Sequence, residues 1–136
     1  MEKYIVMSST KDTSTFELES SLQLTDFVEI LLEPLYKYQH LYLIRLGLHE
    51  ALVNAVKHGN KFDSSKIIKV KRIITPHWWV WIIQDQGQGM VHEKRKFTLP
   101  KRKDSVSGRG LFIINECFDD VRWSPKGNKL QLALKR

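Results

Sequence analysis

Short stretches of alternating or continuous apolar residues recur along this chain, and they are typical of β-strands. The strands are expected at residues 2–7, 14–19, 66–75, 78–84, 121–123 and 130–134. The stretch Trp78-Trp79-Val80-Trp81-Ile82-Ile83 is apolar at every position. A strand without a polar face is covered on both sides, so this stretch predicts a strand in the centre of the sheet.

Three other stretches have apolar residues three and four positions apart, which predicts helices. The first follows Ser20 and Ser21, which are expected to cap it, and Pro34 is expected to kink or end it. The second runs from about His40 to His58, and Gly59 is expected to end it in the left-handed conformation. The third covers residues 111–118. Helices interleaved with strands predict an α/β fold, a two-layer sandwich with helices on one face of a mixed β-sheet.

Length and composition indicate one folded domain over residues 1–136, since 42% of the residues are apolar. No stretch is long and apolar enough to span a bilayer, and the first residues lack a signal-peptide pattern, so neither a membrane nor secretion is expected. The single cysteine, Cys117, lies among apolar residues and is interpreted as a buried structural thiol. We therefore expect a cytoplasmic protein.

The net charge of +7 is concentrated in one segment. Residues 86–110 contain seven Lys or Arg and two Asp or Glu, which is a net charge of +5. Within it, residues 91–107 show no periodicity and are expected to form a long loop. This basic loop would cover phosphates, contact an acidic partner protein, or simply be solvated. Charge alone would also suit a nucleic-acid binder, but a basic run is more often a solvated surface.

The predicted second helix carries polar side chains with helical spacing. Glu50, Asn54 and His58 lie four residues apart and share one helical face. The opposite face is apolar and carries Leu48, Leu52 and Ala55. A helix face with a carboxylate and an amide could hold a hydrated cation and position a proton acceptor. An ordinary amphipathic surface helix has the same pattern.

Two glycine-rich segments favour the functional interpretation. Asp85-Gln86-Gly87-Gln88-Gly89-Met90 follows the central strand, and Ser107-Gly108-Arg109-Gly110-Leu111 opens the third helix. Alternate glycines let the backbone turn sharply and approach a ligand. Free N–H groups at a helix start bind phosphate oxygens. Together with the helix and the basic loop, these segments predict a nucleotide site.

The order and spacing of these segments resemble the GHKL superfamily of ATP-binding domains, which has the Bergerat, histidine-kinase-like ATPase fold. Residues 50–59 look like the N box, 85–89 like the first glycine box, and 108–111 like the second. Within the superfamily, the chain is most similar to anti-sigma-factor serine/threonine kinases of the RsbW and SpoIIAB type. One departure is Gly127-Asn128-Lys129, where the family usually has Gly-Thr before the last strand.

The resemblance implies ATP and Mg²⁺ as cofactors and assigns roles to residues. Glu50 would be the catalytic general base, Asn54 the Mg²⁺ ligand, and Asp85 the acceptor of the adenine amino group. The full set of nucleotide-binding residues would be Asn54, Lys57, His58, Asp85, Gly87, Gly89, Met90, Gly108, Arg109, Gly110 and Leu111. From the residues themselves, Lys57 is equally well a solvated lysine, and His58 equally well a helix-end residue.

The resemblance also implies an activity and partners. The chain would be an anti-sigma regulatory factor that binds a sigma factor and phosphorylates a STAS-domain anti-sigma antagonist. The resembled kinases commonly form homodimers, and the sequence leaves open whether this chain does. The alternative is an ATP-binding module that sequesters a partner without phosphotransfer. Glu50 favours the kinase, because a serine hydroxyl needs a proton acceptor to become a good nucleophile.

Overall fold

The computed structural model describes residues 3–98 and 109–136. In chain order the elements are β1 (Tyr4–Ser9), β2 (Thr13–Glu19), α1 (Thr25–Leu32), η1 (Glu33–Leu35), α2 (Leu41–Asn54), η2 (Ala55–Gly59), β3 (Ile67–Ile74), β4 (Trp78–Gln84), η3 (His92–Lys94), α3 (Arg109–Cys117), β5 (Asp120–Trp123) and β6 (Lys129–Lys135). The turns η1 and η3 are 3₁₀ helices, and η2 is a π-helical turn that continues α2.

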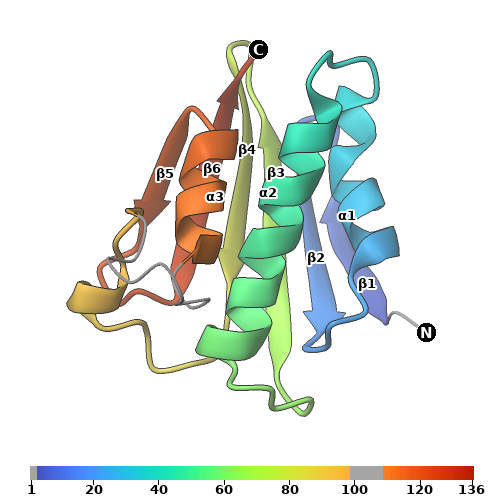
Figure 1. The fold of residues 1–136 in the computed structure, drawn as a ribbon. Coiled ribbons are helices and arrows are strands. Elements are labelled where there is room, and N and C mark those ends of the chain that lie inside the picture. Colours follow the sequence, from blue (N-terminus) through green and yellow to red (C-terminus); the bar gives the residue numbers. More distant parts are fainter. Residues whose placement is uncertain (1–2, 99–108) are drawn as a thin grey trace.

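The strands form one six-stranded sheet in the order β1-β2-β3-β4-β6-β5. Helices α1, α2 and α3 lie side by side on one face of it (Figure 1). The predicted α/β two-layer sandwich is confirmed, but every described strand pair is antiparallel, so the sheet is not mixed as expected. The reason lies in the connections: α1 and α2 run in opposite directions between β2 and β3, which returns the chain to the end where β2 finished.

The core lies between the sheet and the helices. Strand β2 alternates half-buried and buried residues, as expected of a sheet with one covered face. Strand β4 lies between β3 and β6, which confirms that the most apolar stretch is central. Its Trp81 is fully buried, and its indole N–H donates to the Leu31 carbonyl oxygen of α1 at 3.1 Å. Cys117 is buried as predicted, and burial raises the pKa of its thiol.

The start of the first helix differs from the prediction. Helix α1 begins at Thr25, so Ser20 and Ser21 do not cap it. The intervening Leu24 is fully buried in the core, and its insertion delays the first helical turn. Ser21 instead accepts a hydrogen bond from the Gln23 N–H at 3.0 Å in the preceding turn. Pro34 lies in the 3₁₀ turn that ends this helix, as expected.

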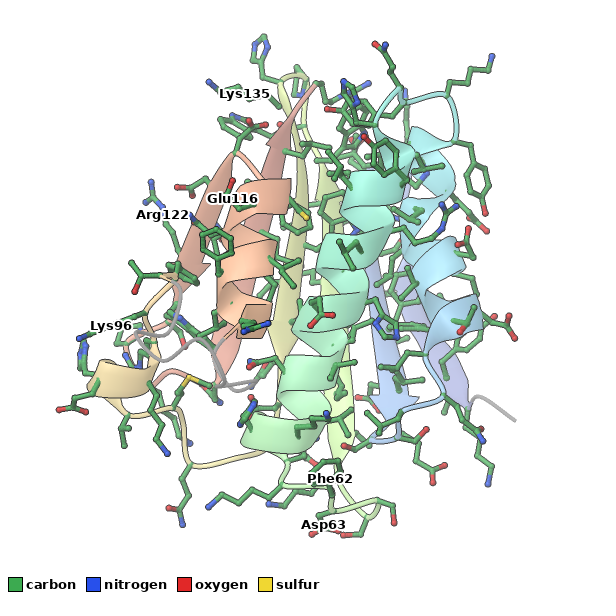
Figure 2. All side chains as sticks on the ribbon, viewed as in Figure 1. Phe62, Asp63, Lys96, Glu116, Arg122 and Lys135 are labelled. Carbon is green, nitrogen blue, oxygen red and sulfur yellow. The ribbon has the colours of Figure 1, made fainter. Side chains whose placement is uncertain are left out.

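The second helix is confirmed, but it ends differently. Its last turn is the π-helical turn η2, and Gly59 is not left-handed. The left-handed residues are Lys61 and Phe62, with φ of 52° and 61°. The Phe62 N–H donates to the Val56 carbonyl oxygen at 2.9 Å and closes the helix end. Figure 2 shows Phe62 and Asp63 just beyond this helix end, and Lys135 at the opposite end of the fold.

The predicted basic loop is only partly described. Residues 91–98 contain η3, whereas residues 99–107 of the predicted loop lie outside the described residues. Within residues 3–98 and 109–136, no helix has the length and apolarity to cross a lipid bilayer.

Candidate functional site

The predicted site residues that the structure describes gather at one end of the helical layer. They come from the second half of α2, the first turn of α3 and the loop that follows β4 (Figure 1). Residues far apart in the sequence therefore meet there. Gly108 lies outside the described residues, so its place in this group stays a prediction.

Glu50 is half-buried on α2 and lies beside the start of α3. A Cβ added to Gly110 would lie 3.2 Å from the Glu50 carboxylate oxygen Oε2. Glycine at this position therefore leaves space for the carboxylate. Arg45, five residues earlier in α2, donates through two of its three side-chain nitrogens, Nε and Nη2, to the carboxylate of Glu29 in α1. Arg45 is thus committed to Glu29 and is not an ion-pair partner that fixes Glu50.

Asn54 is half-buried at the last α-helical position of α2, one turn after Glu50. Beyond it the wider π turn replaces the α-helical spacing, so the predicted alignment of His58 with this face does not follow from regular helix geometry. The side chains of Lys57 and His58 are exposed. Partial burial, with the charges of Lys57 and Lys94, lowers the pKa of His58, which favours its neutral form at pH 7.

Asp85 is the buried carboxylate of the site, with 7% of its surface exposed. Its Oδ1 accepts the Gly87 N–H at 2.7 Å, and its own N–H donates to the Asn128 carbonyl oxygen at 3.0 Å. Burial raises the pKa of Asp85, against the lowering effect of the Gly87 N–H and of two nearby lysines. Among the described residues, no donor reaches the second oxygen, Oδ2.

Three glycines allow close contact between segments around Asp85. A Cβ on Gly59 would overlap the Asp85 carboxyl group, and one on Gly87 would overlap the Gly59 carbonyl oxygen. Gly89 has φ of 96°, and a Cβ there would overlap the Lys126 carbonyl oxygen. The close approach that these glycines permit is thus between protein segments. Their predicted approach to a nucleotide is additional to this packing.

The other predicted site residues, Met90, Leu111 and Arg109, differ in how far their side chains are exposed. Met90 is half-buried, and its N–H donates to the Gly127 carbonyl oxygen at 3.0 Å. Leu111 is buried in the core with 5% of its surface exposed, so its side chain is structural, and only its backbone can face a ligand. Arg109 is exposed at the first position of α3.

Two contributors to the site were missed in the sequence. Asn60, expected only as part of a helix stop, is fully buried and hydrogen-bonded to Gln86 and Ile67. Arg95, expected in a basic loop, donates to the carbonyl oxygens of Met90, Pro125 and Lys126. The only sequence signal for Arg95 was its position near glycine-rich segments, which does not identify its acceptors.

Known proteins share this sequence pattern. A family model described as histidine kinase-like ATPase domain matches residues 24–134. The serine-protein kinase RsbW of Bacillus licheniformis is 28% identical over 94 residues, which cover 64% of this chain and 59% of that protein. The anti-sigma F factor of Anoxybacillus flavithermus is 33% identical over 90 residues, covering 63% of this chain and 61% of the relative. RsbW of Staphylococcus epidermidis is 27% identical over 128 residues, covering 85% and 80%.

The matched region thus spans less than two thirds of the first two relatives and four fifths of the third. The family match spans most of the present chain and includes both the α2 residues and the glycine segment after β4. The α/β fold, with a layer of helices on one face of the sheet, agrees with this family. The chain belongs to the histidine kinase-like ATPase domain family, the GHKL superfamily, and is similar to anti-sigma factors and kinases of the RsbW type.

Proposed function

We propose that this protein is an ATP-dependent serine/threonine kinase of the anti-sigma type. It would bind a sigma factor and phosphorylate a STAS-type anti-sigma antagonist. Its similarity to serine-protein kinases and to an anti-sigma F factor supports this class of activity. The observation that carries the proposal is the placement of Glu50: a half-buried carboxylate beside the first turn of α3, one helical turn before Asn54 and without an ion pair to Arg45.

The residues around Asp85 fit an adenine base. Asp85 presents one oxygen that no described donor occupies, and its other oxygen is fixed by Gly87. Placed opposite C6 of the base, this oxygen would accept a hydrogen bond from the adenine amino group and would repel the guanine C6 carbonyl oxygen, so it would favour adenine. The sequence Asn128-Lys129, which stands where the family usually has Gly-Thr, is compatible with this arrangement. Asn128 accepts the Asp85 N–H through its backbone carbonyl oxygen, which does not depend on its side chain.

The donor set also fits Mg²⁺ that is bound mainly by phosphates. Among the described residues, no group of three or more His, Cys, Asp or Glu side chains could enclose a metal ion. Mg²⁺ in phosphate-transfer sites is commonly held by one or two protein oxygens together with phosphates and water. The Asn54 amide oxygen would be such a protein ligand, with Lys57 close by in the next turn.

In this proposal, Glu50 takes the proton from the acceptor hydroxyl. Bound ATP supplies the phosphoryl group. The proximity of Glu50 to Gly110 puts its carboxylate at the start of α3, where the helix dipole attracts negative charge. Glu50 would therefore take the proton close to the phosphate site, and Asn54 would hold the Mg²⁺ that neutralises phosphate charge. Phosphoryl transfer depends mostly on such positioning and charge stabilisation.

A phosphotransfer assay tests the proposal directly. The protein would be incubated with radiolabelled Mg-ATP and a serine-bearing STAS-domain antagonist, and the label on the antagonist measured. Labelling that requires both Mg²⁺ and the antagonist's serine is the expected result. Tight ATP binding without labelling would support the alternative, a partner-sequestering module. A sigma factor as partner would place the protein in the cytoplasm, and sedimentation would establish whether it is a homodimer.

Asp85→Asn should weaken ATP binding about tenfold or more, because loss of one hydrogen-bonded partner in a buried site costs about 1–3 kcal/mol. Titration calorimetry measures this. The wild-type affinity should also fall as pH is lowered through the raised pKa of Asp85, since a neutral carboxyl is a weaker acceptor. The variant should lack that component of the pH dependence. Wild-type affinity in Asp85→Asn would contradict the assignment of Asp85 to adenine.

A further inference from the structure

Asn60 links three segments through a closed ring of hydrogen bonds. Its Oδ1 accepts the Gln86 N–H at 2.8 Å, and its Nδ2 donates to the Ile67 carbonyl oxygen at 3.1 Å. Gln86 completes the ring, because its Oε1 accepts the Ile67 N–H at 2.8 Å. The ring joins the end of α2, the first residue of β3 and the glycine segment after β4.

The ring forms where β3 and β4 separate. Their regular pairing ends at Lys69 and Gln84, and its continuation would place Ile67 opposite Gln86. The main chains of Ile67 and Gln86 do not bond to each other there. Instead, the two side-chain amides of Asn60 and Gln86 supply the partners that the backbone groups would otherwise lack. The loop can therefore leave the sheet while these three backbone groups stay hydrogen-bonded.

This separation decides where the Asp85 carboxylate lies. Asp85 immediately precedes the Gln86 N–H that Asn60 holds. It is enclosed by Gly59, the residue before Asn60, whose backbone also touches Gly87. Asn60 is fully buried and uses both ends of its amide, so it has no freedom to adopt another position. A shift of the Asp85–Gln86 peptide would move the carboxylate directly.

We infer that Asn60 is the positioning residue that aims Asp85 at the base and thereby sets the preference for adenine over guanine nucleotides. The inference rests on the proposed function, in which Asp85 accepts the adenine amino group. Asn60 touches no part of the nucleotide in this scheme and acts through the Gln86 N–H alone. Its effect should therefore appear in base selectivity as well as in stability.

The test compares ATP and GTP affinities by titration calorimetry, with thermal unfolding measured in parallel. Asn60→Ala leaves the Gln86 N–H without its acceptor and should reduce the ratio of ATP to GTP affinity about tenfold. Asn60→Asp keeps an oxygen for the Gln86 N–H, but it replaces the donor to Ile67 with an oxygen that repels the Ile67 carbonyl, and it buries a carboxyl group. It should unfold at a lower temperature than wild type but keep much of the ATP preference.

Trp81→Phe is the matched control for loss of a buried hydrogen bond. It removes the bond to the Leu31 carbonyl oxygen in the core, away from the nucleotide site. It should lower the unfolding temperature and leave the ATP preference unchanged. Should Asn60→Ala not fold, Asn60→Ser replaces it, because its hydroxyl lies on a shorter side chain and does not reach both partners.

The possible results separate this inference from the proposed function. Wild-type selectivity that is lost in Asp85→Asn but kept in folded Asn60→Ala or Asn60→Ser would overturn the role of Asn60 alone. An equal loss of selectivity in Trp81→Phe would also overturn it, since destabilisation would then explain the effect. A wild-type protein that does not prefer ATP would overturn the role of Asp85 in the proposed function, and this inference with it.

Discussion

Glu50→Gln should slow phosphoryl transfer to a serine acceptor about a hundredfold or more, because general-base catalysis contributes about 10²–10⁴-fold. ATP binding should be unchanged, since glutamine keeps the shape of the side chain and loses only its basicity. The Glu50 carboxylate lies beside Gly110, and its neighbour Arg45 is bound to Glu29. A single-turnover assay with the antagonist measures the rate of transfer, and calorimetry measures ATP binding.

Glu29→Gln is the matched control for this change. It makes the same substitution on a neighbouring helix and disrupts the Arg45 ion pair, which is largely exposed. Exposed ion pairs contribute about 0–1 kcal/mol, so stability should change little and the rate of transfer not at all. A wild-type rate of transfer in Glu50→Gln would remove Glu50 from the mechanism. The carboxylate would then be a surface group on an amphipathic helix.

The sequence predicted the helices and strands that can be recognised from the apolar and polar pattern of one contiguous stretch. The apolar run of β4 and the alternation of β2 identified the strands, and helical spacing identified α2. The N-box residues and the glycine segment after β4 were also recognisable, because each is a short contiguous pattern. Even there, the antiparallel arrangement of the sheet depended on how α1 and α2 return the chain, which no single stretch encodes.

The parts that were missed depend on distant partners. Asn60 lies 26 positions before Gln86, and Arg95 lies about 30 positions before its acceptors Pro125 and Lys126. Both side chains satisfy backbone groups that become available only when the loop leaves the sheet. The π turn at η2 likewise accompanies the packing of Gly59 against Asp85. A sequence pattern gives residue types and spacing, but it does not show which carbonyl will need a donor.

Gly59→Ala should weaken ATP binding about tenfold or more, since a lost buried hydrogen bond costs about 1–3 kcal/mol. Overpacking should also lower the stability of the fold by about 1–3 kcal/mol. The added Cβ would overlap the Asp85 carboxyl group, which is held by Gly87 and cannot rotate away without losing that bond. The helix end would move, or the carboxylate would turn from its present direction. Either change disturbs the oxygen that is available to the base.

Gly47→Ala on the same helix is the control for this substitution. A Cβ there would approach the side chains of Phe118 and Cys117, at 2.6 and 2.8 Å, on the face of α2 that packs against α3. Alanine favours a helix interior over glycine by about 1 kcal/mol, which applies to Gly47 within α2 but not to Gly59 at the end of the π turn, so the two variants are compared by ATP affinity. Gly47→Ala should therefore change the unfolding temperature but keep ATP affinity, because it crowds the core and not Asp85. Equal ATP affinities in the two variants would show that the contact between Gly59 and Asp85 has no part in nucleotide binding, and that the end of α2 tolerates displacement without consequence for the site.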